Sequence, residues 1–187
     1  MQQDIQLARR LFNINEYYRM AESGILEESA RVELINGEII SMSPINSNHS
    51  GLINLITRNL FTILGNSASI SIQNPLRLNE YSEPEPDIVV AKFKKDAYRT
   101  AHPTPKEVYF LVEVSDSSLD FDRKIKIPLY AKAGVPEYWI VNIPEQQVEI
   151  YTHPGDGEYL NRYIAKKGDT AKATGIHFEI PVSTLFE

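Results

Sequence analysis

A glutamate inside an apolar strand is the feature that most restricts how this chain can fold. Residues 110 to 115 have the sequence FLVEVS, in which Glu113 stands among strand-forming apolar residues. A carboxylate in such a place is costly unless another group pairs with it. A second acid, Asp87, opens another apolar run directly behind Pro86, in the sequence EPEPDIVVAKF. The fold must therefore provide partners for both acids.

The two acids can belong to one site. Strands are predicted over residues 87 to 91 and 108 to 114. If these strands are antiparallel neighbours, both carboxylates reach the same end of the sheet, where Cβ atoms on paired strands lie about 5 Å apart. Two acids that close do not both ionise comfortably alone. Mg²⁺ resolves the conflict, because it takes carboxylates, water and phosphate oxygens as ligands, and the backbone carbonyl of Val114 can supply a further oxygen.

Local signals mark several boundaries along the chain. Asn13 and Glu16 form a capping box, and Asn36-Gly37 is a strong hairpin signal. The patterns predict a helix over 13–22, strands near 31–35 and 38–43, a helix from His49 that ends at Gly65, a strand over 68–78 with Pro75 at an edge or bulge, a hairpin formed by EYWIVN and QQVEIYTH, and about two short C-terminal strands.

A further helix is predicted from Ser117 or Ser118 to Ala133, ending at Gly134. Pro128 removes one backbone donor and should kink it. Phe121, Ile125 and Leu129 fall on one face of this helix, and Asp122, Lys126 and Tyr130 form a neighbouring stripe.

The order of these elements predicts the fold class. Helix, hairpin, helix, strands, helix and strands indicate an α/β or α+β fold, with a mixed sheet flanked by helices, an N-terminal hairpin and extra C-terminal strands. The chain has 187 residues, no internal repeat and no long linker, so one domain over 1–187 is expected.

Composition excludes several classes of protein. There is no cysteine, which excludes disulfides and thiolate metal sites. The sequence contains neither the apolar segment of a signal peptide nor a run long enough for a membrane helix, so we expect a cytoplasmic protein with no membrane partner. The net charge of -6 argues against a generally basic nucleic-acid surface but leaves room for a local basic patch.

Lys126 lies one helical turn after Asp122, on the stripe that can face the acidic end of the sheet. An ammonium group there can orient or deprotonate an attacking water and offset charge on a phosphate. The alternative is ordinary, because residues four apart on a helix most often form a solvated surface pair. The sequence alone leaves both interpretations open.

At this point the motifs resemble a known family. Pro86-Asp87, the sequence EVS at 113–115, the spacing D-x-x-x-K at 122–126 and YAKAGVPEYWIVN at 130–142 are similar to the bacterial putative restriction endonuclease family, a branch of the PD-(D/E)XK nuclease superfamily. ELINGEIISMSP followed by His49 also resembles the N-terminal signature of that family. The resemblance covers roughly residues 10 to 185.

The resemblance implies a restriction endonuclease-like core and metal-dependent hydrolysis of DNA phosphodiester bonds. By this likeness Asp87 and Glu113 would bind Mg²⁺, or alternatively Mn²⁺, and Lys126 would be the catalytic lysine, moved from strand to helix. The chain departs from the superfamily at Ser115, where the usual motif has a lysine. Either Lys126 replaces that lysine from the helix, or the site is impaired.

Further candidates are less specific. Members of the superfamily often add an acid from an N-terminal segment, which makes Glu38 a candidate third acid and Glu33 a slightly weaker one. Both flank the hairpin turn, so exposed cross-strand positions are the alternative. His49 opens the long helix and can contact phosphate or the attacking water, although a polar residue at a helix start needs no such role.

Basic residues gather where a phosphate backbone can lie, and Lys92, Arg123 and Lys124 are the candidate substrate-binding residues. We expect DNA as the partner and keep a homodimer as one option for assembly. Three classes of function remain open: a Mg²⁺-dependent endonuclease, a weak or inactive nuclease-fold protein that binds DNA or a protein, and a binding module whose acidic pocket holds a metal for structure.

Overall fold

A six-stranded mixed sheet forms the centre of the fold. The computed structural model describes residues 9–27 and 29–187. The strand order is β3-β4-β5-β6-β7-β8, and only β5 and β6 run parallel. The strands are β3 (Ala68–Ile72), β4 (Ile88–Lys92), β5 (Val108–Ser115), β6 (Glu137–Asn142), β7 (Gln147–Pro154) and β8 (Tyr159–Ala165).

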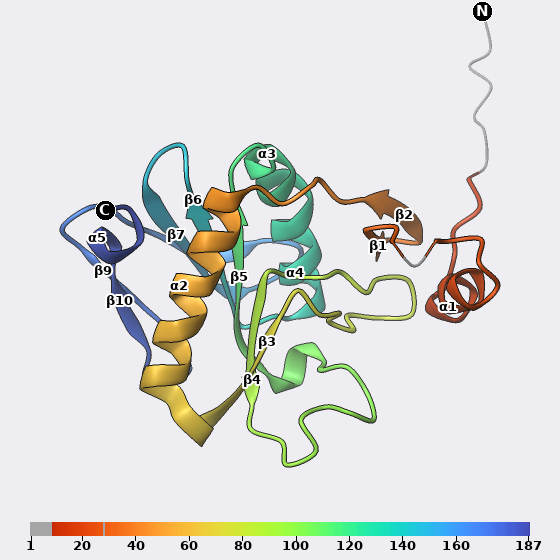
Figure 1. Ribbon diagram of the computed structural model, residues 1–187, viewed down its shortest axis with the longest axis horizontal. Coiled ribbons are helices and arrows are strands. Elements are labelled where there is room, and N and C mark those ends of the chain that lie inside the picture. Colours follow the sequence, from red (N-terminus) through yellow and green to blue (C-terminus); the bar gives the residue numbers. More distant parts are fainter. Residues whose placement is uncertain (1–8, 28) are drawn as a thin grey trace, which may run out of the picture.

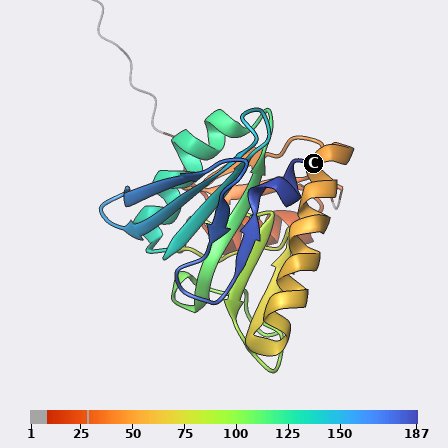
Figure 2. The ribbon, with the colours of Figure 1, turned by 90° about the vertical axis from the view of Figure 1, so that its left-hand side faces the viewer.

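Helices cover both faces of the sheet (Figures 1 and 2). The long helix α2 (Ser47–Leu64) packs on one face together with the C-terminal elements β9 (Thr170–Lys172), β10 (Glu179–Pro181) and α5 (Val182–Leu185). The other face is covered by a helix in three parts: α3 (Leu119–Phe121), a π-helical turn η3 (Asp122–Lys126) and α4 (Ile127–Ala133). This arrangement confirms the predicted mixed sheet flanked by helices.

Side chains of the central strands point alternately to the two faces of the sheet and fill a separate core on each face. Phe110 and Trp139 face α2 and stack with their ring centroids 5.0 Å apart. Leu111 and Tyr138 face the opposite way and pack against Tyr130 of α4. Because side chains alternate along a strand, β5 directs Glu113 to the same face as Leu111.

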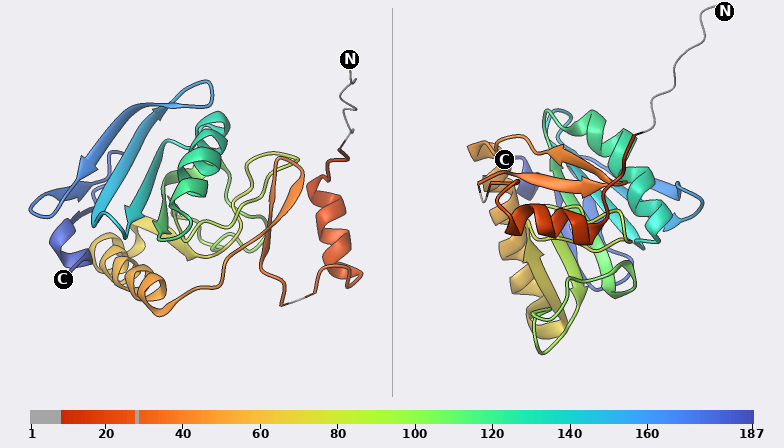
Figure 3. Two further views of the ribbon diagram at one scale, coloured as in Figure 1. Left: turned by 90° about the horizontal axis from the view of Figure 1, so that it is seen from above. Right: turned by 90° about the vertical axis from the view of Figure 1, so that its right-hand side faces the viewer.

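The N-terminal elements form a separate layer at one end of the molecule (Figure 3). Helix α1 (Ile14–Glu22) begins with the predicted capping box, and the hairpin of β1 (Val32–Ile35) and β2 (Glu38–Ser41) turns at Asn36 and Gly37, both with positive φ. The hairpin attaches to the irregular segment 73–87, because the Glu83 N–H donates to the Leu34 carbonyl at 2.8 Å.

The structure differs from the sequence predictions in the bounds and number of several elements. The predicted strand over 68–78 stops at Ile72, and the chain then runs irregularly through Pro75. The C-terminal part holds three strands and a short helix rather than two strands. The short 3-10 helices η1 (Gly65–Ser67) and η2 (Pro105–Glu107) were not predicted. In the described residues, no helix combines the length and the apolar character needed to cross a membrane.

Candidate metal and catalytic site

Asp87 and Glu113 lie side by side at one end of the sheet. Strands β4 and β5 are antiparallel with Ile88 opposite Val112, so the residues just beyond this pair are Asp87 and Glu113. The Asp87 N–H donates to Glu113 Oε2 at 3.2 Å, and the Val114 N–H donates to Asp87 Oδ2 at 2.8 Å. The two strands are thus antiparallel neighbours, which is the condition under which the sequence brings both carboxylates to one end of the sheet.

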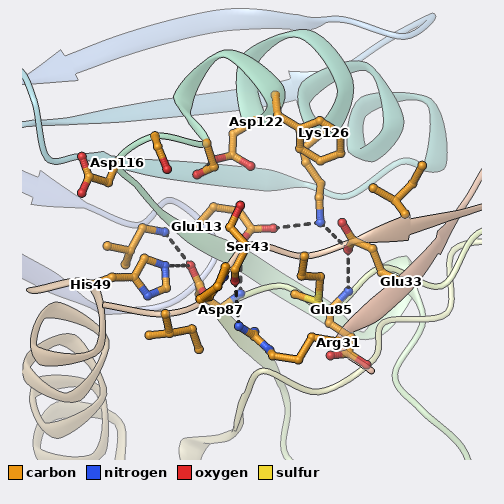
Figure 4. A pocket seen from close by; sticks show the side chains of 18 of the residues that line it. Arg31, Glu33, Ser43, His49, Glu85, Asp87, Glu113, Asp116, Asp122 and Lys126 are labelled. Carbon is orange, nitrogen blue, oxygen red and sulfur yellow. Dashed lines mark hydrogen bonds and ion pairs between the residues drawn. The ribbon is translucent and has the colours of Figure 1, made fainter. Parts of the chain in front are cut away.

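The partner of Glu113 is Lys126. Lys126 Nζ lies 3.5 Å from Glu113 Oε1 and 2.6 Å from Glu33 Oε2, and its side chain is only 4% exposed (Figure 4). The Tyr130 hydroxyl donates to Glu113 Oε1 at 3.0 Å. The costly glutamate of the apolar strand is thus satisfied by a lysine and a tyrosine from the covering helix.

The π-helical turn explains how Lys126 reaches the sheet. The Ile127 N–H bonds to the Asp122 carbonyl, five residues back, which widens the turn. Pro128 has no N–H and cannot donate the next hydrogen bond of an α-helix. The predicted kink at Pro128 is therefore seen as the π-helical turn that immediately precedes α4. Asp122 and Lys126 both point inward and are buried, whereas Ile125 is 40% exposed.

Ser115 anchors the inner end of the same turn. Its hydroxyl donates to Asp122 Oδ2 at 2.7 Å, and the Ser118 hydroxyl donates to the same oxygen at 2.8 Å. Burial raises the pKa of Asp122, although the two serine hydrogen bonds and Lys126 partly oppose this. Ser115 therefore ties β5 to the helical segment that carries Lys126.

Burial and charge set the protonation of the central pair. Burial, together with the charge of Asp87, raises the pKa of Glu113 well above its usual range, although Lys126 acts in the other direction. For Lys126, burial alone would lower the pKa, but Glu113 and Glu33 outweigh it and raise the pKa above its ordinary value. Lys126 is therefore a fixed positive charge at neutral pH.

His49 reaches the site from the first turn of α2. Its Nε2 lies 3.0 Å from Asp87 Oδ2, and its Nδ1 is buried without a hydrogen-bond partner among the described residues. The hydrogen bond with Asp87 raises the pKa of His49, while burial opposes the shift. Asn46 caps α2 by accepting from the His49 N–H, which fixes the start of this helix beside Asp87.

These groups line a pocket of about 340 Å³. Asp87, Glu113, Val114, Lys126 and His49, all candidates from the sequence, contribute to its wall. The lining also includes residues that the sequence ranked lower or missed: Arg31, Glu33, Glu85 and Asp122. The sequence left open whether the stripe that contains Asp122 faces solvent or the sheet. Asp122 is buried, so this stripe faces the sheet.

Four other candidates lie away from this pocket. Glu38 pairs with Arg9 at 2.8 Å on an exposed part of the hairpin, so the third acid near Lys126 is Glu33 instead. Lys92 ends β4, the strand that Asp87 precedes, and its Nζ donates to the Lys106 carbonyl at 2.9 Å. The other two are on the covering helix, where Arg123 binds Glu149 and Lys124 pairs with Asp120.

The donor set can be compared with the needs of a metal ion. Among the described residues, no group of three His, Cys, Asp or Glu side chains is already arranged to hold a metal. The pocket nevertheless presents two adjacent carboxylates, Asp87 and Glu113, beside the Val114 backbone. Two carboxylates with remaining positions left for water suit a hard cation such as Mg²⁺. The residues present therefore fit a magnesium ion in chemistry.

Comparison with known proteins agrees with this fold. A crystal structure of a putative nuclease belonging to DUF820 from Anabaena variabilis ATCC 29413 superposes with a TM-score of 0.75 at 15% sequence identity, over 94% of this chain and 97% of that one. At this identity the likeness shows the fold alone. A search of curated protein sequences finds no match. The family model Uma2, described as putative restriction endonuclease, matches residues 14–183. The chain therefore belongs to the Uma2 family of putative restriction endonucleases.

Proposed function

We propose that this protein is a metal-dependent endonuclease that hydrolyses DNA phosphodiester bonds. The observation that carries the proposal is the meeting of Asp87, Glu113 and Lys126 in one pocket, although one precedes β4, one lies in β5 and one lies in η3. Family membership supports the nuclease class.

The two strand-end carboxylates, with the Val114 carbonyl, would hold Mg²⁺ or Mn²⁺. When bound, such an ion supplies a Lewis acid for a phosphoryl oxygen and lowers the pKa of a bound water. The chain contributes the position of the carboxylates: the Val114 N–H fixes Asp87, and the Asp87 N–H fixes Glu113. Because backbone donors orient both acids, their positions need little rearrangement on binding.

Lys126 then acts as a charge rather than as a base. Its raised pKa keeps the ammonium protonated, so it stabilises negative charge that develops on the phosphate instead of removing a proton from water. Glu33 holds the ammonium from the hairpin side at 2.6 Å. His49 positions Asp87 through its Nε2, which lies 3.0 Å from Asp87 Oδ2.

A second candidate is a nuclease-fold protein that binds DNA or a protein partner without cutting DNA. One observation favours it: Ser115 stands where the superfamily lysine is found, and its hydroxyl is already committed to Asp122. Lys126 is also engaged by two carboxylates before any substrate arrives. The two candidates differ in turnover and not in metal binding.

Plasmid nicking tests the proposal. The assay uses supercoiled DNA with Mg²⁺ or Mn²⁺ and compares the wild type with Asp87→Asn and with Asp120→Asn, an exposed aspartate on the covering helix. We expect Asp87→Asn to lose activity by on the order of a hundredfold or more, while Asp120→Asn keeps it. Calorimetric titration with each metal should give heat in the wild type and much less in Asp87→Asn.

The outcomes separate the candidates. Metal-dependent nicking that Asp87→Asn abolishes supports the endonuclease. Metal binding and DNA binding without nicking favour the inactive nuclease fold. Equal residual nicking in the wild type and in Asp87→Asn would identify a contaminating nuclease and remove the support for catalysis by this chain.

A further inference from the structure

The pocket around Asp87 and Glu113 holds more acidic than basic groups. Six carboxyl groups line it, from Glu33, Glu85, Asp87, Glu113, Asp116 and Asp122. Three basic side chains line it, from Arg31, His49 and Lys126. The excess of acids repels a phosphate that enters the pocket, and a cation that no acid has already engaged attracts it most strongly.

Two of the three basic groups are engaged. Lys126 Nζ lies within ion-pair distance of Glu33 and Glu113 and is buried. The His49 ring faces Asp87 at 3.0 Å. Both groups therefore act from fixed positions, because turning away would leave a buried carboxylate unpaired, which is costly.

Arg31 is different. In the part of the chain that the structure describes, its guanidinium forms no ion pair with a carboxylate within 4.0 Å. One N–H of the group donates to the Ser43 carbonyl at 3.0 Å (Figure 4). An arginine carries five N–H donors, so the remaining donors are available while the Ser43 contact fixes the orientation of the group. The side chain is only half-buried, so a ligand in solution can reach its exposed part.

We propose that Arg31 binds a phosphate of the DNA backbone at the pocket, beside the metal-binding acids; this inference rests on the proposed function. The planar guanidinium fork matches two phosphate oxygens at once, which an ammonium cannot do. Arg31 precedes β1, whereas Lys126 comes from η3, so the two cations approach the substrate from separate elements. Arg31 thereby supplies affinity and register for the strand to be cut.

A DNA-binding experiment tests this role. Fluorescence anisotropy with a labelled 20-base-pair duplex would compare the wild type, Arg31→Ala, Arg31→Gln and Arg31→Lys over a series of salt concentrations. Arg58→Ala is the matched control, because Arg58 is exposed in the middle of α2 and its loss removes the same charge. Arg31→Gln keeps a polar N–H group and lacks the charge, and Arg31→Lys keeps the charge and lacks the planar fork.

We expect Arg31→Ala and Arg31→Gln to weaken binding by about tenfold and to lower the slope of log K against log salt by about one. Arg31→Lys should keep the slope and recover only part of the affinity. Arg58→Ala should change affinity by less than about twofold. A purely structural role at the Ser43 loop would leave the salt slope of every Arg31 variant unchanged, which overturns the proposal.

The failure of this inference can be told from the failure of the proposed function. If the wild type binds and nicks DNA while all Arg31 variants match Arg58→Ala, Arg31 has no substrate role and the endonuclease stands. If the wild type binds no DNA at any salt concentration or with either metal, the proposed function fails first, and the inference fails with it.

Discussion

Lys126 is held by two carboxylates in a place that solvent scarcely reaches. It contacts Glu33 at 2.6 Å and Glu113 at 3.5 Å, and Tyr130 supplies a further donor to Glu113. Removing one member of a buried charged group is expensive, because the remaining charge has neither water nor partner. A lysine that serves catalysis here must therefore also serve stability, and the two contributions have to be separated by experiment.

A double-mutant cycle separates them. Lys126→Met leaves Glu33 and Glu113 without their cation, so we expect a loss of about 3–5 kcal/mol in the free energy of unfolding at pH 7. Adding Glu33→Gln removes the closer of the two stranded charges and should recover part of that loss. Urea unfolding of the four proteins in the cycle measures the coupling.

Lys124→Met is the matched control for this cycle. Lys124 pairs with Asp120 on the exposed side of the same helical segment, and an exposed pair contributes little. We expect its loss to cost less than about 0.5 kcal/mol. If Lys126→Met cost no more than Lys124→Met, the buried ion pair would not support the fold.

The sequence predicted that Asp87 and Glu113 lie together, and it ranked Glu38 above Glu33, whereas the structure places Glu33 and not Glu38 at the pocket. Glu33 pairs with Ile40 and Glu38 pairs with Ile35, so both glutamates lie on the same face of the hairpin. They differ in their position along it, because Glu38 adjoins the turn and Glu33 lies towards the pocket. The alternation of side chains along a strand predicts which face of the hairpin each glutamate is on. The distance of each glutamate from Lys126 depends on how the hairpin packs against the rest of the fold.

At the scale of elements, the hairpin positions Glu33 and depends on its turn. Gly37 has a φ of +79°, and a Cβ at this residue would lie 2.6 Å from the Leu11 Cβ. Gly37→Ala therefore introduces both backbone strain and a clash, and we expect the free energy of unfolding to fall by about 2 kcal/mol. Thermal and urea unfolding would measure the change, and nicking activity should fall with it as Glu33 shifts.

Gly51→Ala gives the opposite control. Gly51 lies inside α2, and a Cβ there would meet no atom within 4 Å. Alanine loses less backbone entropy than glycine in a helix, so this variant should gain about 0.5–1 kcal/mol. If Gly37→Ala and Gly51→Ala changed the free energy of unfolding by the same amount, the conformation of the turn would not control the stability of the hairpin.

The covering helix shows where sequence patterns stop being decisive. Its length, its end at Gly134 and the disturbance near Pro128 follow from local chemistry. Its orientation does not, because the apolar stripe that includes Ile125 and the polar stripe that includes Lys126 both satisfy helical spacing. The polar stripe is buried because Glu113 and Ser115 of β5 offer it partners. Only the tertiary structure brings those partners together.

At the scale of the whole molecule, Glu149 joins three elements of the fold. This carboxylate is buried on β7, where it binds Arg123 of η3 and Arg162 of β8. Burial alone would raise its pKa, but hydrogen bonds from Arg123, Tyr151 and Asn142 lower the pKa of Glu149 to about 2. The ionised carboxylate therefore links the covering helix, the sheet and the edge strand.

The low pKa predicts how the stability of the molecule responds to acid. The unfolded chain binds a proton at Glu149 near the usual value of 4.5, whereas the folded chain does so only near pH 2. The stabilisation is present in full above pH 4.5 and is lost as the pH falls towards 2. We expect about 2 kcal/mol, a value reduced because Arg123 and Arg162 are partly exposed.

The difference between the wild type and Glu149→Gln isolates this contribution, because the other carboxylates titrate in both proteins. Urea unfolding between pH 7 and pH 2 should show a difference that is constant down to about pH 4.5 and shrinks below it. Glu179→Gln is the control, since Glu179 forms an exposed pair with Lys172. A difference for Glu149→Gln that stays constant to pH 2 would mean that the carboxylate acts through packing and not through its charge.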